Sequence, residues 1–309
     1  MTTAYEVIIQ RASQPLPPLD TSQQPQLTQL AGIRAVLFDI YGTLMVSGVG
    51  DIGLSMSDSN KLAVGATPFA AALTPFAAAL SASGLDYSGD GQQGAQLLHQ
   101  QIQASHQADR AAGIPHPEVD IVEIWLQTCG QLASRGELPT PPPADFDYQR
   151  LAIEYEVRIN PVWPMPGLKS CLKRLTGLGQ DLGIISNAQF FTPLLFPAIV
   201  EATLDQLGFD RRLRFYSYRY RQAKPSCHLY QLAATALAQQ SIDPSAVLYV
   251  GNDLRNDIWP AAQVGYKTAL FAGDARSLRL HENDPNRTQY GQPDAIVTHL
   301  EQIPKIIES

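Results

Sequence analysis

The sequence predicts an α/β fold in which a doubly wound parallel sheet carries an inserted, mainly helical domain. Four short apolar runs end in polar or glycine-containing corners, and helical patterns lie between them. Short apolar runs are typical of strands buried on both faces, and strands that alternate with helices are typical of parallel sheets. The predicted strands are residues 33–38, 182–185, 246–250 and 267–271.

Helical segments between these runs support the same fold. Residues 167–178 carry apolar positions at helical spacing. Residues 227–239 follow a Lys-Pro pair, and residues 256–264 follow the polar corner after the third run. Each segment has the position expected of a crossover helix in a parallel sheet.

The stretch 47–163 interrupts the alternation. It is rich in Ala, Gln and Leu and is bounded by glycines on one side and prolines on the other, which indicates a helical domain inserted after the first strand. The core domain then consists of 31–46 and 164–309. Residues 1–30 form an N-terminal extension, in which 5–9 are predicted to be a short edge strand and the Pro-, Gln- and Ser-rich remainder an irregular surface segment.

Composition narrows the class of partner. The chain has 309 residues, 45% hydrophobic content and a formal charge of −7, as expected of a globular protein. The acidic balance argues against nucleic acid and fits a small anionic substrate held in a local cationic pocket. No apolar stretch reaches the ~20 residues of a membrane span, and no signal-peptide pattern is visible. Three cysteines without pair spacing favour the cytoplasm. A monomer and a homodimer both stay open.

Polar side chains gather where the predicted strands end and before Pro225. These candidate site residues are Asp39, Tyr41, Thr43, Ser186, Asn187, Lys224, Asn252, Asp253 and Asp257. Because ligands of open α/β sheets bind at the carboxyl ends of the strands, we expect these residues to converge on one crevice.

The residue types suggest covalent catalysis on an anion. A carboxylate nucleophile such as Asp39 forms a covalent ester or acyl phosphate and divides one difficult displacement into two easier ones. A Mg²⁺ ion held by oxygens would offset the repulsion between this carboxylate and a dianionic phosphate. Lys224 would supply fixed positive charge, and the Ser186 hydroxyl would hold the transferring oxygens.

With these motifs in this order, the chain resembles the haloacid dehalogenase-like (HAD) hydrolase superfamily over 31–46 and 164–275. The resemblance implies a Rossmann-like core with a helical cap domain at 47–163. It also implies Asp39 as the nucleophile, with Ser186 and Lys224 binding the phosphoryl or carboxylate group. The implied catalytic residues are Asp39, Tyr41, Ser186 and Lys224. The implied Mg²⁺ ligands are Asp39, the Tyr41 carbonyl and a residue of the fourth motif, for which Asn252, Asp253 and Asp257 all stay open. The implied substrate contacts are Thr43, Asn187 and Tyr230.

Two departures from the family pattern bear on the reaction. Phosphatases of the family usually carry Asp where this chain has Tyr41, as the acid for the leaving group. The Asp-x-Tyr-Gly-Thr form, together with Tyr230 six residues after Lys224, is similar to the 2-haloacid dehalogenases. Those enzymes hold the halide with an Arg after the nucleophile, but this chain has no Arg between Arg34 and Arg110.

The fourth motif favours the phosphatases of the family over the dehalogenases. Gly-Asn-Asp-Leu-Arg-Asn-Asp at 251–257 is closer to the metal-binding form than to the Ser-x-Asn-x-x-Asp of the dehalogenases, although Asn252 replaces its first carboxylate. We therefore expect a Mg²⁺-dependent phosphatase that acts on a small phosphorylated metabolite. The alternatives are a metal-independent 2-haloacid dehalogenase and a non-catalytic binding or regulatory protein on the same fold.

Overall fold

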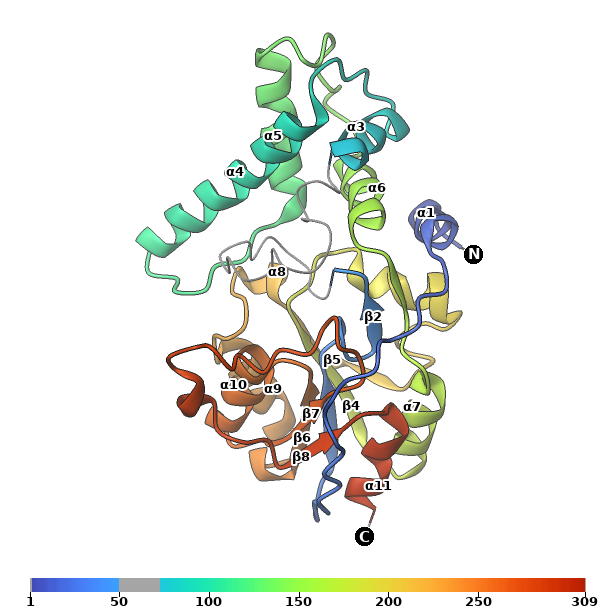
Figure 1. Cartoon of the computed structure of the whole chain (residues 1–309), viewed down its shortest axis with the longest axis vertical. Helices are drawn as coiled ribbons and strands as arrows, with labels where there is room; N and C mark the ends of the chain where they lie inside the picture. The colour runs from blue at the N-terminus through green and yellow to red at the C-terminus, as the bar shows by residue number, and fades with distance from the viewer. Residues whose placement is uncertain (1, 50–72, 309) are drawn as a thin grey trace.

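The computed structural model of the chain describes residues 2–49 and 73–308 (Figure 1). Its centre is a six-stranded, entirely parallel sheet in the order β5-β4-β1-β6-β7-β8. The strands are β1 (Ala35–Phe38), β4 (Asp181–Ser186), β5 (Phe209–Tyr216), β6 (Val247–Gly251), β7 (Lys267–Phe271) and β8 (Ala295–Val297). The predicted α/β fold is confirmed, and all four predicted runs are strands. The three-residue β8 is too short to be singled out from the sequence.

Helices cover both faces of the sheet. In β1, Val36 and Phe38 belong to the apolar cluster under α7 (Leu168–Gly177) and α11 (Ile303–Ile307). Ala35 and Leu37 point the other way, into the cluster under α9 (His228–Ala238) and α10 (Trp259–Gln263). This alternation is the period of two expected of a strand buried on both sides, and it fixes which end of the sheet receives the polar residues that follow.

Short helical turns complete the core. They are α8 (Ser217–Tyr220), η2 (Thr192–Leu194), η3 (Phe196–Val200), η4 (Pro244–Ala246), η5 (Leu254–Ile258), η6 (Arg287–Tyr290) and η7 (Leu300–Gln302). The helix predicted at 256–264 begins as the π turn η5 and continues as α10.

A second group of helices lies beyond the carboxyl ends of the strands (Figure 1). The short antiparallel strands β2 (Met45–Ser47) and β3 (Val162–Pro164) connect it to the core. Its helices are α3 (Leu73–Ala82), α4 (Gly91–Ala111), α5 (Ile121–Ser134) and α6 (Tyr148–Ile159). They have an apolar core of their own, in which Trp125 stacks on Phe76 with ring centroids 5.4 Å apart. We call this group the cap; its limits at 47 and 163 stay predictions, and residues 50–72 of it lie outside the described chain.

The edge strand predicted at 5–9 is wrong. These residues belong to helix α1 (Ala4–Ala12). Thr3 accepts a hydrogen bond from the Glu6 amide, and the Glu6 side chain accepts one from the Thr3 amide, which together form a capping box. This local signal at the start of the segment outweighs the β-branched residues that suggested a strand. The helix buries Ile9 and packs against both α6 of the cap and η3 of the core.

The remainder of the extension is irregular, as predicted, and follows the β8 edge of the sheet. Gln26 pairs with Ile296, and the Leu30 amide donates to the Ile306 carbonyl at 2.7 Å. Further back, the Leu19 amide donates to the carboxylate of Asp274 at 2.9 Å. The extension therefore contacts the loop after β7, which borders the site described next.

Candidate active site

Asp39 lies at the centre of the sheet edge that faces the cap. It follows β1 directly, and its amide donates to the Val250 carbonyl of β6 at 2.9 Å. The chain then turns at Gly42, where φ is +80° and a Cβ would come within 2.5 Å of the Ser277 Cβ. Only glycine allows this turn, so the sequence after Asp39 forces the carboxylate to end its strand in the crevice.

Lys224 joins the first and fourth motifs. Its Nζ is 2.8 Å from Asp39 Oδ1 and 2.5 Å from Asp257 Oδ1. Burial alone would lower the pKa of Lys224, but Asp257 and Asp39 outweigh this effect and raise it above its ordinary value. The ammonium group is therefore charged, and one buried cation holds two buried carboxylates.

Asp257 is fixed from three sides. Besides Lys224, the Tyr249 hydroxyl donates to Oδ1 at 3.1 Å and the Asp253 amide donates to Oδ2 at 3.0 Å. Burial raises the pKa of Asp257, and Lys224 opposes that rise. With both oxygens engaged, Asp257 acts as the support of Lys224.

Asn252 and Asp253 are also held in place. Asn252 Oδ1 accepts from the Thr43 hydroxyl at 3.0 Å, and Asn252 Nδ2 donates to the Ser277 carbonyl at 2.6 Å. Asp253 Oδ1 accepts from two main-chain amides of η5 and lies 2.7 Å from His281 Nε2. Burial raises the pKa of Asp253, but these hydrogen bonds outweigh it, and the pKa lies below its usual range.

Asn187 locks the main chain of Lys224. Asn187 Oδ1 accepts from the Lys224 amide at 2.8 Å, and Nδ2 donates to the Lys224 carbonyl at 3.4 Å. Ser186 is fully buried, and its hydroxyl donates to the Asn187 carbonyl at 3.3 Å. Tyr230 donates to the Asn256 carbonyl at 3.0 Å. Ser186 and Tyr230 therefore lie behind the crevice and support the residues that line it.

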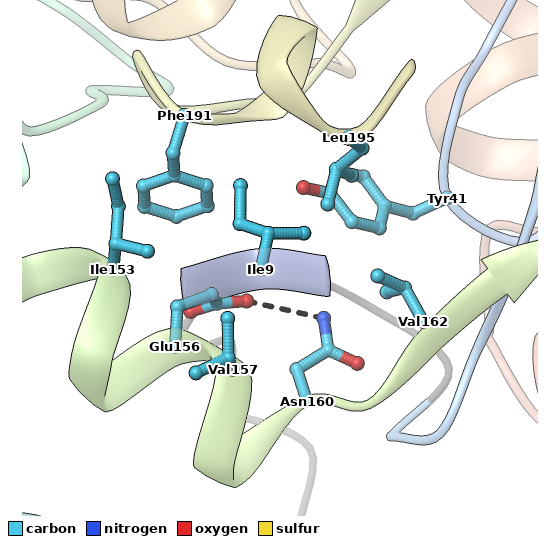
Figure 2. Close-up of a pocket in the computed structure, with 9 residues that line it drawn as sticks. All are labelled: Ile9, Tyr41, Ile153, Glu156, Val157, Asn160, Val162, Phe191 and Leu195. Atoms are coloured by element: carbon cyan, nitrogen blue, oxygen red, sulfur yellow. Dashed lines mark hydrogen bonds between the residues drawn. The ribbon is translucent and has the colours of Figure 1, made fainter. Parts of the chain in front are cut away.

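The Tyr41 ring lies in a cavity whose lining residues do not include Asp39. This separate, mainly apolar cavity of about 10 Å³ lies between α1, α6 and the loop at Phe191 (Figure 2). Its hydroxyl is 3.0 Å from Thr192 Oγ1, and burial raises the pKa of Tyr41 well above its ordinary value. A leaving group at Asp39 would therefore meet the main chain of Tyr41 rather than its phenol.

A polar pocket of about 30 Å³ opens at the sheet edge. Its lining residues are Asp39, Tyr41, Asn187, Lys224, Asn252, Asp253, Asn256, Asp257 and Arg279. Thus seven predicted site residues meet in one pocket, whereas Thr43, Ser186 and Tyr230 are not among the residues that line it. The roles assigned to all of them stay predictions.

Asn256 and Arg279 are the two pocket residues that were not predicted, and of these Arg279 lies outside all of the sequence motifs. It comes from the loop after β7, where its amide donates to the Asn252 carbonyl at 3.0 Å and its carbonyl accepts from the Leu254 amide at 2.9 Å. Its Nη1 donates to the Arg276 carbonyl at 2.6 Å. No motif or strand end marks this position, and only the pairing of the loop with the fourth motif brings the guanidinium to the pocket.

The oxygen donors of the pocket suit Mg²⁺ by chemistry. Asp39, the Tyr41 carbonyl and Asn252 offer hard oxygen atoms, and Mg²⁺ is commonly bound by one or two carboxylates together with water and substrate oxygens. Asp253 and Asp257 each accept hydrogen bonds at both carboxylate oxygens, whereas Asn252 Oδ1 accepts one, from Thr43, and keeps a second lone pair. Within residues 2–49 and 73–308, no three His, Cys, Asp or Glu side chains form a group that could hold a metal alone. The ligand set that fits Mg²⁺ is therefore Asp39, the Tyr41 carbonyl and Asn252, in which Asp39 is the single carboxylate.

Comparison with known proteins identifies the class. A family model of haloacid dehalogenase-like hydrolases matches residues 33–265. Because this match spans most of the chain and the core has the fold of that family, the chain belongs to the haloacid dehalogenase-like hydrolases. None of the curated protein sequences matches it significantly.

Solved structures of both dehalogenases and phosphatases are similar. A 2-haloacid dehalogenase from Pseudomonas syringae pv. Tomato DC3000 is 20% identical with a TM-score of 0.53, covering 89% of this chain and 97% of that chain. The defluorinating L-2-haloacid dehalogenase Rha0230 is 17% identical with a TM-score of 0.50, and the match covers 96% of this chain and 100% of that chain. A HAD phosphatase from Thermococcus onnurineus is 16% identical with a TM-score of 0.49, and the match covers 89% of this chain and 97% of that chain. The likeness to the two dehalogenases shows the fold alone.

Proposed function

We propose that the protein hydrolyses phosphate esters of small metabolites, with Asp39 as the nucleophile. The observation that carries the proposal is the polarity of the pocket, because eight of its nine lining residues are Asp, Asn, Lys or Arg. A carbon–halogen centre needs apolar contacts for its carbon chain, whereas a phosphoryl group needs cations and hydrogen-bond donors. The lining supports the second kind of substrate.

The first step is attack on phosphorus. Lys224 holds Asp39 through Oδ1, which leaves Oδ2 as the attacking atom. A bond forms between this oxygen and phosphorus while the bond from phosphorus to the ester oxygen breaks, and the departing oxygen takes a proton from water. Lys224 and Arg279 offset the charge of the phosphoryl oxygens.

The second step regenerates the carboxylate. A water molecule attacks the phosphorus of the aspartyl phosphate, the bond to Asp39 breaks, and inorganic phosphate leaves after giving its surplus proton to solvent. A bound Mg²⁺ would supply further positive charge to the phosphoryl oxygens, and Asp39, the Tyr41 carbonyl and Asn252 are the residues that would hold it. The cap lies beyond the same ends of the strands (Figure 1) and would limit the access of other water to the pocket.

A panel of phosphate esters, assayed for phosphate release with and without Mg²⁺, tests the proposal. Because the Tyr41 phenol does not reach the leaving group, we expect aryl and acyl phosphates to react faster than alkyl phosphates. The Asp39→Asn variant should lose at least about 1000-fold in rate. The proposal would be refuted if no ester released phosphate, or if the Asp39→Asn variant released phosphate as fast as the wild type.

A 2-haloacid dehalogenase is the second candidate. The position of the Tyr41 ring favours it, because halide leaves without a proton and needs no acid near Asp39. Halide release from 2-chloropropionate that persists in EDTA would support this activity, and its absence at high enzyme concentration would remove it. If phosphate analogues bind but neither reaction is detected, a non-catalytic binding protein becomes the better proposal.

The setting of the reaction follows from the same features. We infer a small anionic substrate and a cytoplasmic protein, as a monomer or homodimer, with neither nucleic acid nor a membrane as partner. Lys224 and Arg279 supply the local cationic character within an acidic chain. All three cysteines are unpaired, which is consistent with a reducing compartment. In the described parts of the chain, no helix has the length and apolar character needed to cross a membrane.

A further inference from the structure

Gln189 connects the cap to the loop that follows β4. The side chain is buried, and both of its polar atoms bind the main chain at the start of α5. Nε2 donates to the Val119 carbonyl at 2.9 Å, and Oε1 accepts from the Ile121 amide at 3.1 Å. A carboxamide that satisfies one donor and one acceptor of a facing segment fixes that segment in register.

Glu118 of the cap is connected to the same loop through Ser217 of α8. Ser217 donates to Glu118 Oε2 at 2.7 Å and accepts from the Ala188 amide at 2.9 Å. Glu118 Oε1 also accepts from Gln189 Nε2 at 3.3 Å. The cap segment 118–121 is therefore hydrogen-bonded to Gln189 directly and to Ala188 through Ser217.

The same cap segment also pairs with the chain that leads to Lys224. The Ala223 amide donates to the His116 carbonyl at 2.8 Å, and the Glu118 amide donates to the Arg221 carbonyl at 3.2 Å. Asn187, two residues before Gln189, binds the Lys224 amide and carbonyl. The docked cap thus fixes two loops, the loop after β4 that carries Asn187 and the loop that leads to Lys224. Together these loops position the ammonium group of Lys224.

The main chain of Gln189 reaches the first motif as well. Its amide donates to Thr192 Oγ1 at 3.2 Å, and the same oxygen lies 3.0 Å from the Tyr41 hydroxyl. Thr192 is fully buried, so water cannot replace these bonds freely. One residue therefore links the cap segment, the loop before Lys224 and the ring two residues after the nucleophile.

We propose that Gln189 is the positioning residue through which docking of the cap orders the catalytic loops. It acts on the reaction only through Asn187, Lys224 and Tyr41. The proposal rests on the phosphatase function for its kinetic consequence, whereas the structural coupling is independent of the substrate.

Gln189→Met tests the proposal because it keeps the length of the side chain and removes its three hydrogen bonds to the cap, two to the main chain and one to Glu118. Loss of the two main-chain bonds alone shifts the docking equilibrium by about 10-fold to 100-fold. In hydrogen-exchange mass spectrometry of the whole protein, we expect faster exchange at Ile121, which loses its acceptor, and also at Lys224, whose own partner Asn187 is unchanged. With p-nitrophenyl phosphate, kcat should fall about tenfold while KM changes less than threefold.

Two further variants separate positioning from general stability. Gln127→Met places the same change on an exposed face of α5 and should leave exchange and kcat as in the wild type. Gln189→Glu keeps the acceptor for Ile121 but sets a buried carboxylate against the Val119 carbonyl and Glu118, so exchange at Lys224 should rise here too. This variant also serves if Gln189→Met does not fold. Wild-type exchange at Lys224 in a folded Gln189 variant would overturn the proposal. If the wild type releases no phosphate, the phosphatase function fails, and the exchange at Lys224 still decides the coupling.

Discussion

Glu156 of α6 offers a test of the electrostatics at the junction of cap, core and N-terminal helix. Its carboxyl group faces the mainly apolar cavity that also receives Ile9 and the Tyr41 ring (Figure 2). Burial raises the pKa of Glu156 to about 7, and the hydrogen bond from Asn160 Nδ2 at 3.1 Å opposes this rise without cancelling it. The group is therefore neutral at mildly acidic pH and charged above neutrality.

The sign of the effect follows from proton linkage. Between its unfolded pKa near 4.5 and its folded pKa near 7, the folded protein binds the additional proton. Stability from this group is thus fully present below pH 4.5 and is lost as the pH rises through 7. A pKa shift of this size corresponds to about 3 kcal/mol of stability. A part of it is already lost below pH 5, and the contact of Glu156 with solvent weakens the effect, so we expect a loss of about 2 kcal/mol between pH 5 and 8.

Glu156→Gln removes the titration and keeps an acceptor for Asn160. We expect its free energy of unfolding to exceed that of the wild type by about 2 kcal/mol more at pH 8 than at pH 5. Urea denaturation at the two pH values measures this difference, and Glu282→Gln on an exposed loop is the matched control. If Glu156→Gln and the wild type differ equally at both pH values, the group does not titrate as its surroundings require.

Three further changes probe the site. Lys224→Met should lower the free energy of unfolding by about 3–5 kcal/mol in urea denaturation, because it leaves two buried carboxylates without their shared cation; wild-type stability would contradict the ion-pair description. Arg279→Gln should raise KM for an anionic ester about tenfold in steady-state kinetics, with the exposed Arg11→Gln as control; an unchanged KM would remove Arg279 from substrate binding. Asn252→Asp should lower the half-saturating Mg²⁺ concentration about tenfold in a metal titration of activity, since it adds a carboxylate; an unchanged value would exclude Asn252 as a ligand.

The core of the fold could be predicted because its signals are local. Each predicted strand is an apolar run that ends in a polar corner, and the parallel arrangement follows from the helices between the runs. Convergence of Asp39, Lys224 and Asp257 follows in turn from the shared edge of parallel strands. The Thr-x-x-Glu capping box that starts α1 is equally local, and it indicates a helix where the β-branched residues suggest an edge strand.

Other features depend on tertiary contacts that no spacing records. Arg279 reaches the pocket only because its loop pairs with the fourth motif. The Tyr41 ring turns towards Thr192 because α1 and α6 form an apolar cavity beside it. The bridge made by Gln189 joins residues about 70 positions apart, and a glutamine in a loop gives no hint of such a partner.

The N-terminal extension has a consequence for the order in which the protein can be completed during synthesis. Leu19, Gln26 and Leu30 are synthesised well before their partners Asp274, Ile296 and Ile306. This part of the extension therefore has no native partner until the chain as far as Ile306 has left the ribosome. Its Pro-, Gln- and Ser-rich sequence keeps the segment hydrated and extended in the meantime. Docking of residues 19–30 along the β8 edge would then follow the formation of the sheet.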